Sequence, residues 1–459
     1  MSASPARSAA FEILLKVERE NAYASDLLHA PRFARLSPSD HGLATELVMG
    51  VLRWQALLDQ NLARASSQRI EKLDAEVLTA LRLGLYQLRF LTRVPARAAL
   101  FESVELVKAA RKRSASAFVN AVLRKVTTDA RTKQSEEHAP AHARVADAFI
   151  AIHEAVDPSA IAQAASHPEW LVKRWVDAYG IEVARKICLH NQTPPVTTIH
   201  IYDNQSLHEL AQSGVQFAPG HLLSKARTVI AGDVAGTSAC RRGGVAIQDE
   251  ASQLVAMLVG RGQSILDCCA APGGKTSLVA HRNPRSTVIA AELHLHRARL
   301  LRSLVHAPNI QVVTADARQL PFSGMFDRIL ADVPCSGTGT LARNPEIKWR
   351  LTAADLDDLQ ARQIAILKSA LARLAPGGRL VYSTCSMERE ENEAVVGAAL
   401  AGRPEFAIAD CRRELEGLHL SGELCAADLD SLLAGPYLRT IPDTHPADGF
   451  FAAIIQRER

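Results

Sequence analysis

The chain has 459 residues, more than a single hydrophobic core organises, so we expect two or three domains. Hydrophobic residues make up 47% of the chain and charged residues 22%, which is an ordinary globular composition. No segment reaches the roughly 18 consecutive apolar residues of a membrane span, and the N-terminus lacks the pattern of a secretory signal. These features exclude an integral membrane protein and predict a cytoplasmic protein with no membrane partner.

The charge and the cysteines narrow the function classes further. The formal net charge is +4, whereas residues 1–150 carry 22 Lys and Arg against 16 Asp and Glu, so we expect this part to dock a polyanion. Eight cysteines are scattered along the chain, and the adjacent pair Cys268 and Cys269 fits neither a disulfide framework nor a metal motif. We therefore predict no metal site, and we expect any special cysteine to be catalytic.

The N-terminal part is Leu- and Ala-rich from Phe11 to about Lys125, and its apolar residues recur every three or four positions. This period predicts an all-helical domain over residues 1–140. The polar stretch from Thr127 to His142 suits a linker.

The next part is mixed. Residues 145–190 read as helices, with WLVKRWVDAYG ending at Gly180, whereas PPVTTIHIY and the turn-rich run that follows read as short strands. We expect a small mixed α/β subdomain over residues 141–240.

From Gln248 onward, apolar strands alternate with helical segments, which predicts a parallel sheet covered on both faces over residues 241–459. The expected strands are SILDCCA, TVIAAEL, IQVVTAD, FDRILADVP, GRLVYSTC and GFFAAIIQ. Ligands of such sheets bind beyond the carboxyl ends of the strands. Those ends carry Cys269, Glu292, Asp316, Asp332 and Cys385.

A glycine turn follows the first of these strands, where APGGKT leads into a helix. Gly273 and Gly274 allow the backbone to approach a ligand, and the helix N-terminus offers free N–H groups. Glu292 follows Gly274 by 18 residues, close to the spacing at which an acid binds ribose hydroxyls, and Asp316 can accept a hydrogen bond from an adenine amino group.

Other readings of this turn are weaker. A phosphate-binding P-loop needs Gly where Cys269 stands, and the GxGxxG pattern of nicotinamide sites is absent. The glycines alone can also form a plain strand-to-helix turn. The acids that end the next two strands favour S-adenosylmethionine, which has an adenosine and no phosphates.

Two cysteines follow neighbouring strands, Cys335 in DVPCSGTGT and Cys385 in STCSMEREENE. Either one alone is more often a structural residue, but a thiolate is also the nucleophile needed to methylate carbon 5 of a cytosine. Addition of the thiolate to carbon 6 makes carbon 5 nucleophilic, and a second thiol can assist release of the product. The strand pattern leaves open which cysteine attacks.

Further polar residues lie near the same edge. Asp332 is placed to contact the Watson–Crick edge of the base, and if it stays protonated or shares a proton with the ring nitrogen it would favour attack at carbon 6. The alternative is an acid that caps the following loop. Arg343 and Lys348 could hold RNA phosphate, although isolated basic residues are usually solvated. The run EREENE is expected to begin a helix and to be mostly a solvated face.

These segments resemble a known family. DCCAAPGGKT, DVPCSGTGT with RNPEIKW, and STCSMEREENE are similar to the motifs of the RNA cytosine-C5 methyltransferases. GLYQLRFLTRVPARAALFESVELVK and FVNAVLRK resemble the all-helical NusB-like domain fused to the bacterial 16S ribosomal RNA member of that family, the Fmu/Sun type. QDEASQLVAMLV and DGFF agree as well. The resemblance spans nearly the whole chain and is weakest over residues 127–166 and 402–441.

The resemblance implies a Rossmann-like methyltransferase domain with a mostly parallel seven-stranded sheet. It makes Cys385 the nucleophile and Cys335 the residue that assists product release. Glu292 replaces the usual Asp of the family and is one methylene longer. The expected S-adenosylmethionine-binding residues are Cys269, Ala270, Ala271, Pro272, Gly273, Gly274, Lys275, Glu292, Asp316 and Asp332.

The resemblance also implies a substrate, 16S ribosomal RNA that is unassembled or part of a small-subunit precursor, acted on by a monomer. A paired base would have to be extruded from its helix to react. Two alternatives stay open: a transfer RNA substrate with the same chemistry, or a catalytically inactive RNA-binding assembly or antitermination factor.

Overall fold

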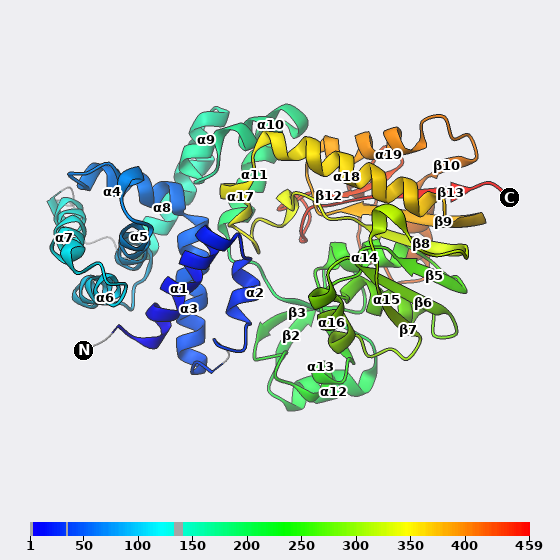
Figure 1. The fold of residues 1–459 in the computed structure, drawn as a ribbon, viewed down its shortest axis with the longest axis horizontal. Coiled ribbons are helices and arrows are strands. Elements are labelled where there is room, and N and C mark those ends of the chain that lie inside the picture. Colours follow the sequence, from blue (N-terminus) through cyan, green and yellow to red (C-terminus); the bar gives the residue numbers. More distant parts are fainter. Residues whose placement is uncertain (1–2, 34, 133–140) are drawn as a thin grey trace. The chain divides into compact units, whose positions relative to one another are not determined.

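The structure, a computed structural model, describes residues 3–33, 35–132 and 141–459. The chain divides into two compact units, and Figure 1 labels their elements. The first unit comprises Met1–Pro194 with Leu341–Arg350, and the second comprises Pro195–Thr340 with Leu351–Arg459. Most of the linker expected from Thr127 to His142 falls on residues 133–140, which lie outside the described residues.

The first unit is helical, and its described residues contain no β-strand. Its helices are α1 (Pro5–Glu20), α2 (Ala24–Leu28), α3 (Pro38–Arg53), α4 (Gln55–Ala65), α5 (Ala75–Phe90), α6 (Ala96–Ala109), α7 (Ser116–Thr132), α8 (Ala141–Glu154), α9 (Pro158–Ala164), α10 (Glu169–Tyr179), α11 (Ile181–Gln192) and α17 (Ile347–Arg350), with 3-10 turns η1 (Ile70–Lys72) and η2 (Arg113–Ala115). The predicted all-helical N-terminal domain is thus confirmed.

Local sequence explains where several of these helices begin. Pro38 occupies the first turn of α3, where its missing N–H costs no hydrogen bond, and the Ser37 side chain accepts a hydrogen bond from the Asp40 N–H at 3.2 Å. Asp157 caps α9 in the same way, through the Ala160 N–H at 2.8 Å. Such caps fix the starts of helices whose apolar faces then build the core.

The two compact units divide between Pro194 and Pro195, whereas the sequence places domain boundaries at residues 140 and 240, and these boundaries stay a prediction. Helices α9 to α11 belong to the helical unit. The Ser166 hydroxyl accepts hydrogen bonds from the Ala56 and Leu57 N–H groups, and the Gln192 amide donates to the Arg53 carbonyl at 3.1 Å. The sequence shows that these segments are helices, but which core their apolar faces join depends on packing.

A small antiparallel sheet opens the second unit, with strand order β2-β3-β1-β4. Ile199, Leu210 and Val245 lie in its core, under two short helices. The elements are β1 (Thr198–Ile201), α12 (Asn204–Gln212), β2 (Gln216–Pro219), β3 (Ala226–Ala231), α13 (Ser238–Arg241) and β4 (Val245–Ile247). These strands and helices are the mixed segment that the sequence predicts.

The large sheet follows, with the parallel order β7-β6-β5-β8-β9 visible in Figure 1 and β13 antiparallel beside β9. Its strands are β5 (Ser264–Asp267), β6 (Thr287–Glu292), β7 (Ile310–Thr314), β8 (Phe326–Asp332), β9 (Leu374–Thr384), β10 (Phe406–Ala409), β11 (Leu433–Ala434), β12 (Tyr437–Thr440) and β13 (Phe450–Arg457). All six predicted strands are present. Over the described residues the sheet has nine strands instead of seven, because the β11–β12 hairpin extends the edge beside β13.

Helices cover both faces of this sheet. One buried cluster joins it to α14 (Glu250–Leu258), α15 (Gly274–Arg282), α16 (Leu295–Leu304) and α20 (Cys411–Leu420), and the other joins it to α18 (Ala353–Leu371) and α19 (Glu393–Leu400). The remaining 3-10 turns are η3 (Ala317–Gln319), η4 (Thr338–Thr340), η5 (Arg389–Glu391) and η6 (Asp430–Leu432).

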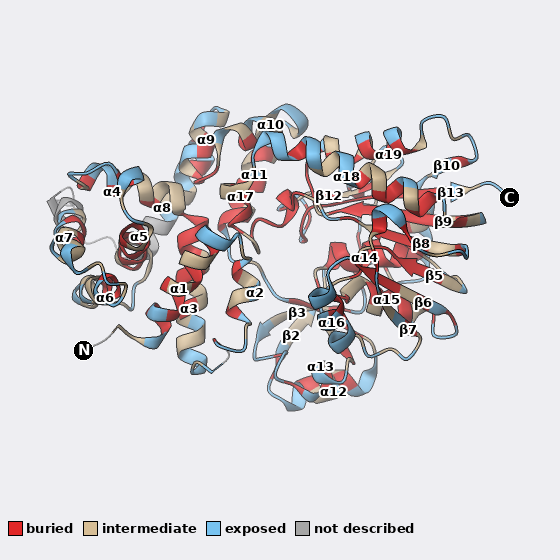
Figure 2. Cartoon of the chain, in the orientation of Figure 1, coloured by how far each residue is buried: buried red, intermediate tan, exposed pale blue. Residues whose placement is uncertain are grey.

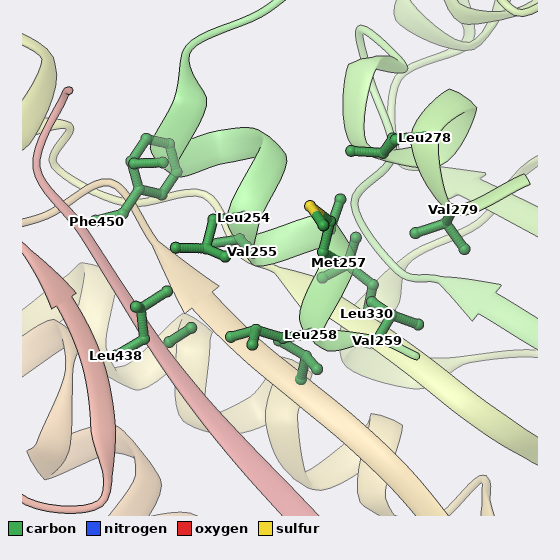
Figure 3. Packing of buried hydrophobic residues seen from close by; sticks show 14 of the residues in the cluster. Leu254, Val255, Met257, Leu258, Val259, Leu278, Val279, Leu330, Leu438 and Phe450 are labelled. Carbon is green, nitrogen blue, oxygen red and sulfur yellow. The ribbon is translucent and has the colours of Figure 1, made fainter. Parts of the chain in front are cut away.

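The burial pattern follows these two layers of helices. In Figure 2 the strands of the sheet are largely buried, whereas the outer faces of the helices are exposed. Figure 3 shows Leu254 and Leu258 of α14 packed near Leu330 of β8 and Phe450 of β13. Among the helices described, none combines the length and apolar character needed to traverse a lipid bilayer.

Candidate active site at the carboxyl ends of the strands

The glycine turn joins β5 to α15 and admits no side chain at its centre. Gly273 has φ +117°, and a Cβ there would lie 2.7 Å from a methyl of Leu301 and 2.8 Å from one of Val305. The Thr276 hydroxyl donates to the Asp267 carboxyl at 2.7 Å, which ties the first turn of α15 to the end of β5. The N-terminus of α15 therefore lies at the carboxyl edge of the sheet, where ligands of such sheets bind.

Burial controls the acid at the end of β5. Asp267 is 3% exposed, and this burial, together with the nearby Asp332 carboxylate, raises its pKa to about 7. The Thr276 hydroxyl and the Lys275 ammonium act in the opposite direction but do not compensate. Asp267 therefore holds a proton far more readily than an exposed aspartate.

Glu292 and Asp316 end the next two strands, but their carboxylates differ in availability. Glu292 is 4% exposed, one oxygen accepts from the His294 N–H at 3.1 Å, and the other has no donor among the described residues. Asp316 accepts hydrogen bonds from the backbone and the side chain of Arg318, and these bonds lower its pKa. The Glu292 oxygen that accepts from His294 also lies 3.8 Å from an Arg297 guanidinium nitrogen, which leaves its second oxygen as the available acceptor. Both oxygens of Asp316, in contrast, already accept from Arg318.

Asp332 ends β8 and is the centre of a charged cluster. One of its oxygens lies 2.8 Å from the Lys275 ammonium, and the other accepts from the Ser383 hydroxyl of β9 at 2.8 Å. The ammonium also lies 4.8 Å from the centre of the Phe450 ring. Burial lowers the pKa of Lys275, but the carboxylates around it, Asp332 foremost, raise the pKa above its ordinary value.

The two cysteines meet beside this cluster, as the strand pattern predicts. β8 and β9 are neighbouring parallel strands, and the Cys335 and Cys385 sulfurs that follow them are 3.3 Å apart. The Gly339 N–H donates to the Cys385 carbonyl at 2.9 Å, which closes one loop on the other. The hydrogen bond with Cys385, together with burial, raises the pKa of the Cys335 thiol, so Cys335 keeps its proton.

The expectation that EREENE is mostly a solvated face is wrong. Glu388, Glu391 and Asn392 are at most 2% exposed, and the Glu391 carboxylate accepts hydrogen bonds from Ser336 and Ser386. Sequence reasoning missed Glu391 because a run of charges looks like surface. The serine that directly follows each cysteine was the signal in the sequence that a buried acceptor such as Glu391 lies nearby.

Lys348 does not lie where the sequence suggested. It belongs to the segment Leu341–Arg350 of the helical unit, is 1% exposed, and donates from its ammonium to the Arg53 carbonyl at 2.8 Å. Burial, and then the Arg53 cation, lowers the pKa of Lys348 well below its ordinary value. The expected phosphate contact of Lys348 is therefore wrong. Arg343 is half-buried in the same segment, and its RNA contact stays a prediction.

Known protein families match most of the chain. The profile for "16S rRNA methyltransferase RsmB/F" matches residues 255–456, and the NusB family matches residues 4–128. A ferredoxin-like domain of RsmF/B-like methyltransferases matches residues 167–229, a range that includes segments of both compact units.

Curated relatives cover nearly the same span. A probable ribosomal RNA small subunit methyltransferase B from Bacillus subtilis is 35% identical over 421 residues, covering 88% of this chain and 90% of the relative. The ribosomal RNA small subunit methyltransferase B of Klebsiella pneumoniae is 30% identical, covering 99% of this chain and 98% of the relative. The chain belongs to the ribosomal RNA small subunit methyltransferase B family. It is an rRNA methyltransferase of the kind that uses S-adenosylmethionine as cofactor, with a NusB-type helical domain before the catalytic sheet.

Solved structures agree with this fold. The crystal structure of PH0851 has a TM-score of 0.77 and 20% identity, covering 100% of this chain and 99% of that chain. A methyltransferase homologue from Pyrococcus horikoshii has a TM-score of 0.53 and 26% identity, covering 64% of this chain and 97% of its own. The all-helical and Rossmann-like parts expected from the sequence are thus confirmed, and the roles of individual site residues stay predictions.

Proposed function

We propose that this rRNA methyltransferase acts on carbon 5 of a cytosine in 16S ribosomal RNA, with Cys385 as the covalent nucleophile. The observation that carries the proposal is the pair of sulfurs, Cys335 and Cys385, 3.3 Å apart at the strand edge that also holds Asp332 and Lys275. Carbon 5 of cytosine is weakly nucleophilic, so its methylation calls for a covalent catalyst, whereas methylation of a ring nitrogen or a ribose oxygen does not.

The residues from Cys269 to Lys275 would hold S-adenosylmethionine, whose sulfonium supplies an electrophilic methyl group. The fit rests on the turn at Gly273, where Leu301 and Val305 leave no room for a Cβ, and on Glu292, whose second oxygen can accept from a ribose hydroxyl. Ala270, Ala271, Pro272 and Gly274 complete the loop. Asp316 would contact the adenine amino group only by sharing its carboxylate with Arg318.

The chain's own groups can carry the remaining steps. The Cys385 thiolate bonds to carbon 6, while Asp332, oriented by Lys275 and Ser383, holds the Watson–Crick edge of the base. Carbon 5 then takes the methyl group. A base, water in the simplest case, removes the proton on carbon 5, and that electron pair restores the ring double bond as the bond from carbon 6 to sulfur breaks. Cys335 can give its proton to the departing Cys385 sulfur, 3.3 Å away.

The substrate part of the proposal is 16S ribosomal RNA, unassembled or within a small-subunit precursor, bound by a monomer. The family description and the names of the relatives support a small-subunit RNA. The basic excess of residues 1–150 suits phosphate contacts in the helical domain. The target base would leave its stack, as in other enzymes that modify bases.

The two thiol roles make opposite predictions for two variants. Cys385→Ala should lose methyl transfer by about 10⁴-fold or more, because no adduct forms, while S-adenosylmethionine still binds. Cys335→Ala should accumulate a covalent protein–RNA complex that is visible on a denaturing gel. The exposed Cys425 gives a matched control, and Cys425→Ala should behave as wild type. Full turnover by Cys385→Ala would refute the nucleophile assignment.

Bisulfite sequencing identifies the substrate and the modified atom together. RNA from cells that lack this protein should lose protection at a cytosine of 16S ribosomal RNA, and the protein should restore it. Protection lost only from transfer RNA would refute the substrate part, and unchanged protection in both RNAs would refute cytosine-C5 methylation.

A further inference from the structure

Glu391 is a buried carboxylate without a cationic partner. It is 0% exposed, lies in the turn η5 after β9, and forms no ion pair among the described residues. A buried charge is expensive unless several hydrogen bonds satisfy it. One oxygen of Glu391 accepts from the Ser336 N–H and from the Gln363 amide, both at 2.8 Å, and the other accepts from the Ser336 and Ser386 hydroxyls.

The donors come from the two loops that carry the thiols. Ser336 directly follows Cys335, and Ser386 directly follows Cys385, so one carboxylate bonds to the neighbour of each cysteine. The loops also bond to each other directly. The Gly339 N–H donates to the Cys385 carbonyl, and the Met387 N–H donates to the Thr338 hydroxyl. The Ser386 hydroxyl lies 3.0 Å from the Ser336 hydroxyl and 3.4 Å from that of Thr338.

Asn392, the residue after Glu391, forms further hydrogen bonds with the loop of Cys385. The Asn392 amide donates to the Ser386 carbonyl at 2.9 Å, and its oxygen accepts from the Thr384 hydroxyl at 2.5 Å. Both contacts belong to the loop of Cys385, whereas Glu391 alone reaches both loops with its side chain. The Tyr382 hydroxyl donates to the Glu391 carbonyl at 2.6 Å and holds this turn against β9.

We propose that Glu391 is a positioning residue that sets the spacing between the Cys335 and Cys385 sulfurs. This inference rests on the proposed two-thiol mechanism, in which one sulfur must pass a proton to the other over a short distance. Loss of the carboxylate would leave the Ser336 N–H without an acceptor, and the two serine hydroxyls would keep only each other and the Thr338 hydroxyl. The loops would then separate to admit water. Reaction rates fall steeply when reacting groups shift by about 1 Å.

The chain offers a matched control. Glu393, two residues further on, forms an ion pair with Arg439 and touches neither cysteine loop. Glu391→Gln and Glu393→Gln therefore make the same change of charge and shape. Only the first replaces one of the two oxygens that the cysteine loops share with an NH2 group, which cannot accept a hydrogen bond. We expect Glu391→Gln to lower single-turnover methyl transfer by about 10²-fold, with unchanged affinity for S-adenosylmethionine, and Glu393→Gln to match wild type.

A second readout reports on the thiols without any RNA. Dibromobimane, a bifunctional alkylating reagent, becomes fluorescent when two nearby thiolates each displace one bromide. Wild type and Glu393→Gln should form the Cys335–Cys385 bridge, identified by peptide mass spectrometry, and Glu391→Gln should form it at least about tenfold more slowly. Equal bridging rates would overturn the positioning role, even if methyl transfer fell. Bridging as expected in a protein that never methylates cytosine would overturn the proposed function and leave the spacing role standing.

A milder variant covers the case in which Glu391→Gln does not fold. Gln363, on α18, gives the carboxylate only one of its four hydrogen bonds. Gln363→Leu should reduce both bridging and methyl transfer below wild type, by smaller factors than the losses of about tenfold and about 10²-fold expected for Glu391→Gln. Wild-type values for both measurements in a folded Gln363→Leu protein would count against the proposal.

Discussion

Lys275 in the second unit and Lys348 in the first are both largely buried, but their surroundings shift the pKa of the ammonium group in opposite directions. The Lys275 side chain is 14% exposed and lies 2.8 Å from the Asp332 carboxylate, and its pKa is raised. Lys348 is 1% exposed, its ammonium donates to the Arg53 carbonyl, and its pKa is lowered. A carboxylate partner preserves the charge in the first case, and its absence disfavours the charge in the second.

The partners of the two lysines also differ in kind. Lys275 stands between an acid and the Phe450 ring at the edge that carries the thiols, where a lasting positive charge can orient Asp332. Lys348 and Trp349 instead donate to the Arg53 and Leu52 carbonyls at the end of α3, groups that a helix end leaves without partners. Lys275 thus lies beside the proposed reacting groups, and Lys348 lies inside the helical unit.

Among the variants that test this comparison of lysines, the largest effect is expected from removing Lys275. Lys275→Met would leave the Asp332 carboxylate without its cation, and breaking such a partly buried pair costs about 3 kcal/mol or more. We expect kcat/KM for methyl transfer to fall by about 10²-fold, measured with labelled S-adenosylmethionine. Lys275→Arg, which keeps the charge, should retain more activity than Lys275→Met. Equal loss in both variants would show that side-chain shape, and not charge, is required.

The burial of Lys348 should affect how the free energy of unfolding depends on pH. The pKa of Lys348 in the folded state lies below its ordinary value of 10.5, so the side chain takes up a proton when the protein unfolds. The contribution of Lys348 to the free energy of unfolding therefore rises with pH up to about 10.5. This contribution is lost as the pH falls toward the folded-state pKa. Urea unfolding at about pH 7 and about pH 9.5 should show that wild type gains more stability with pH than Lys348→Met.

The Lys348→Met variant should also bind RNA as tightly as wild type at every salt concentration. A weakened, less salt-dependent affinity would restore the phosphate contact.

The smallest expected effect concerns the neighbouring indole. Trp349→Phe removes the hydrogen bond from the indole N–H to the Leu52 carbonyl, 2.6 Å long, and should lower the free energy of unfolding by about 1 kcal/mol. Trp170 in α10 has no hydrogen-bond partner for its indole among the described residues, so Trp170→Phe isolates the loss of the larger ring. Equal losses in the two variants would show that the hydrogen bond contributes nothing.

Six strands of the large sheet, the glycine turn and the two cysteines could be predicted from the sequence, because they depend on neighbours along the chain. Apolar runs marked all six predicted strands, and strand order then placed Cys335 and Cys385 at one edge. The family resemblance rests on the same local motifs, and the family profiles agree with it.

The tertiary structure alone decided which core the helices α9 to α11 join, where Lys348 lies, and that Glu391 connects the two thiol loops. A charged residue looks exposed in a sequence, because the acceptor or donor that would compensate its burial lies far away along the chain. Lys348 meets a carbonyl 295 positions away, and Glu391 meets a serine 55 positions away. Only folding brings such partners together, so no local pattern records whether a charge is solvated or buried.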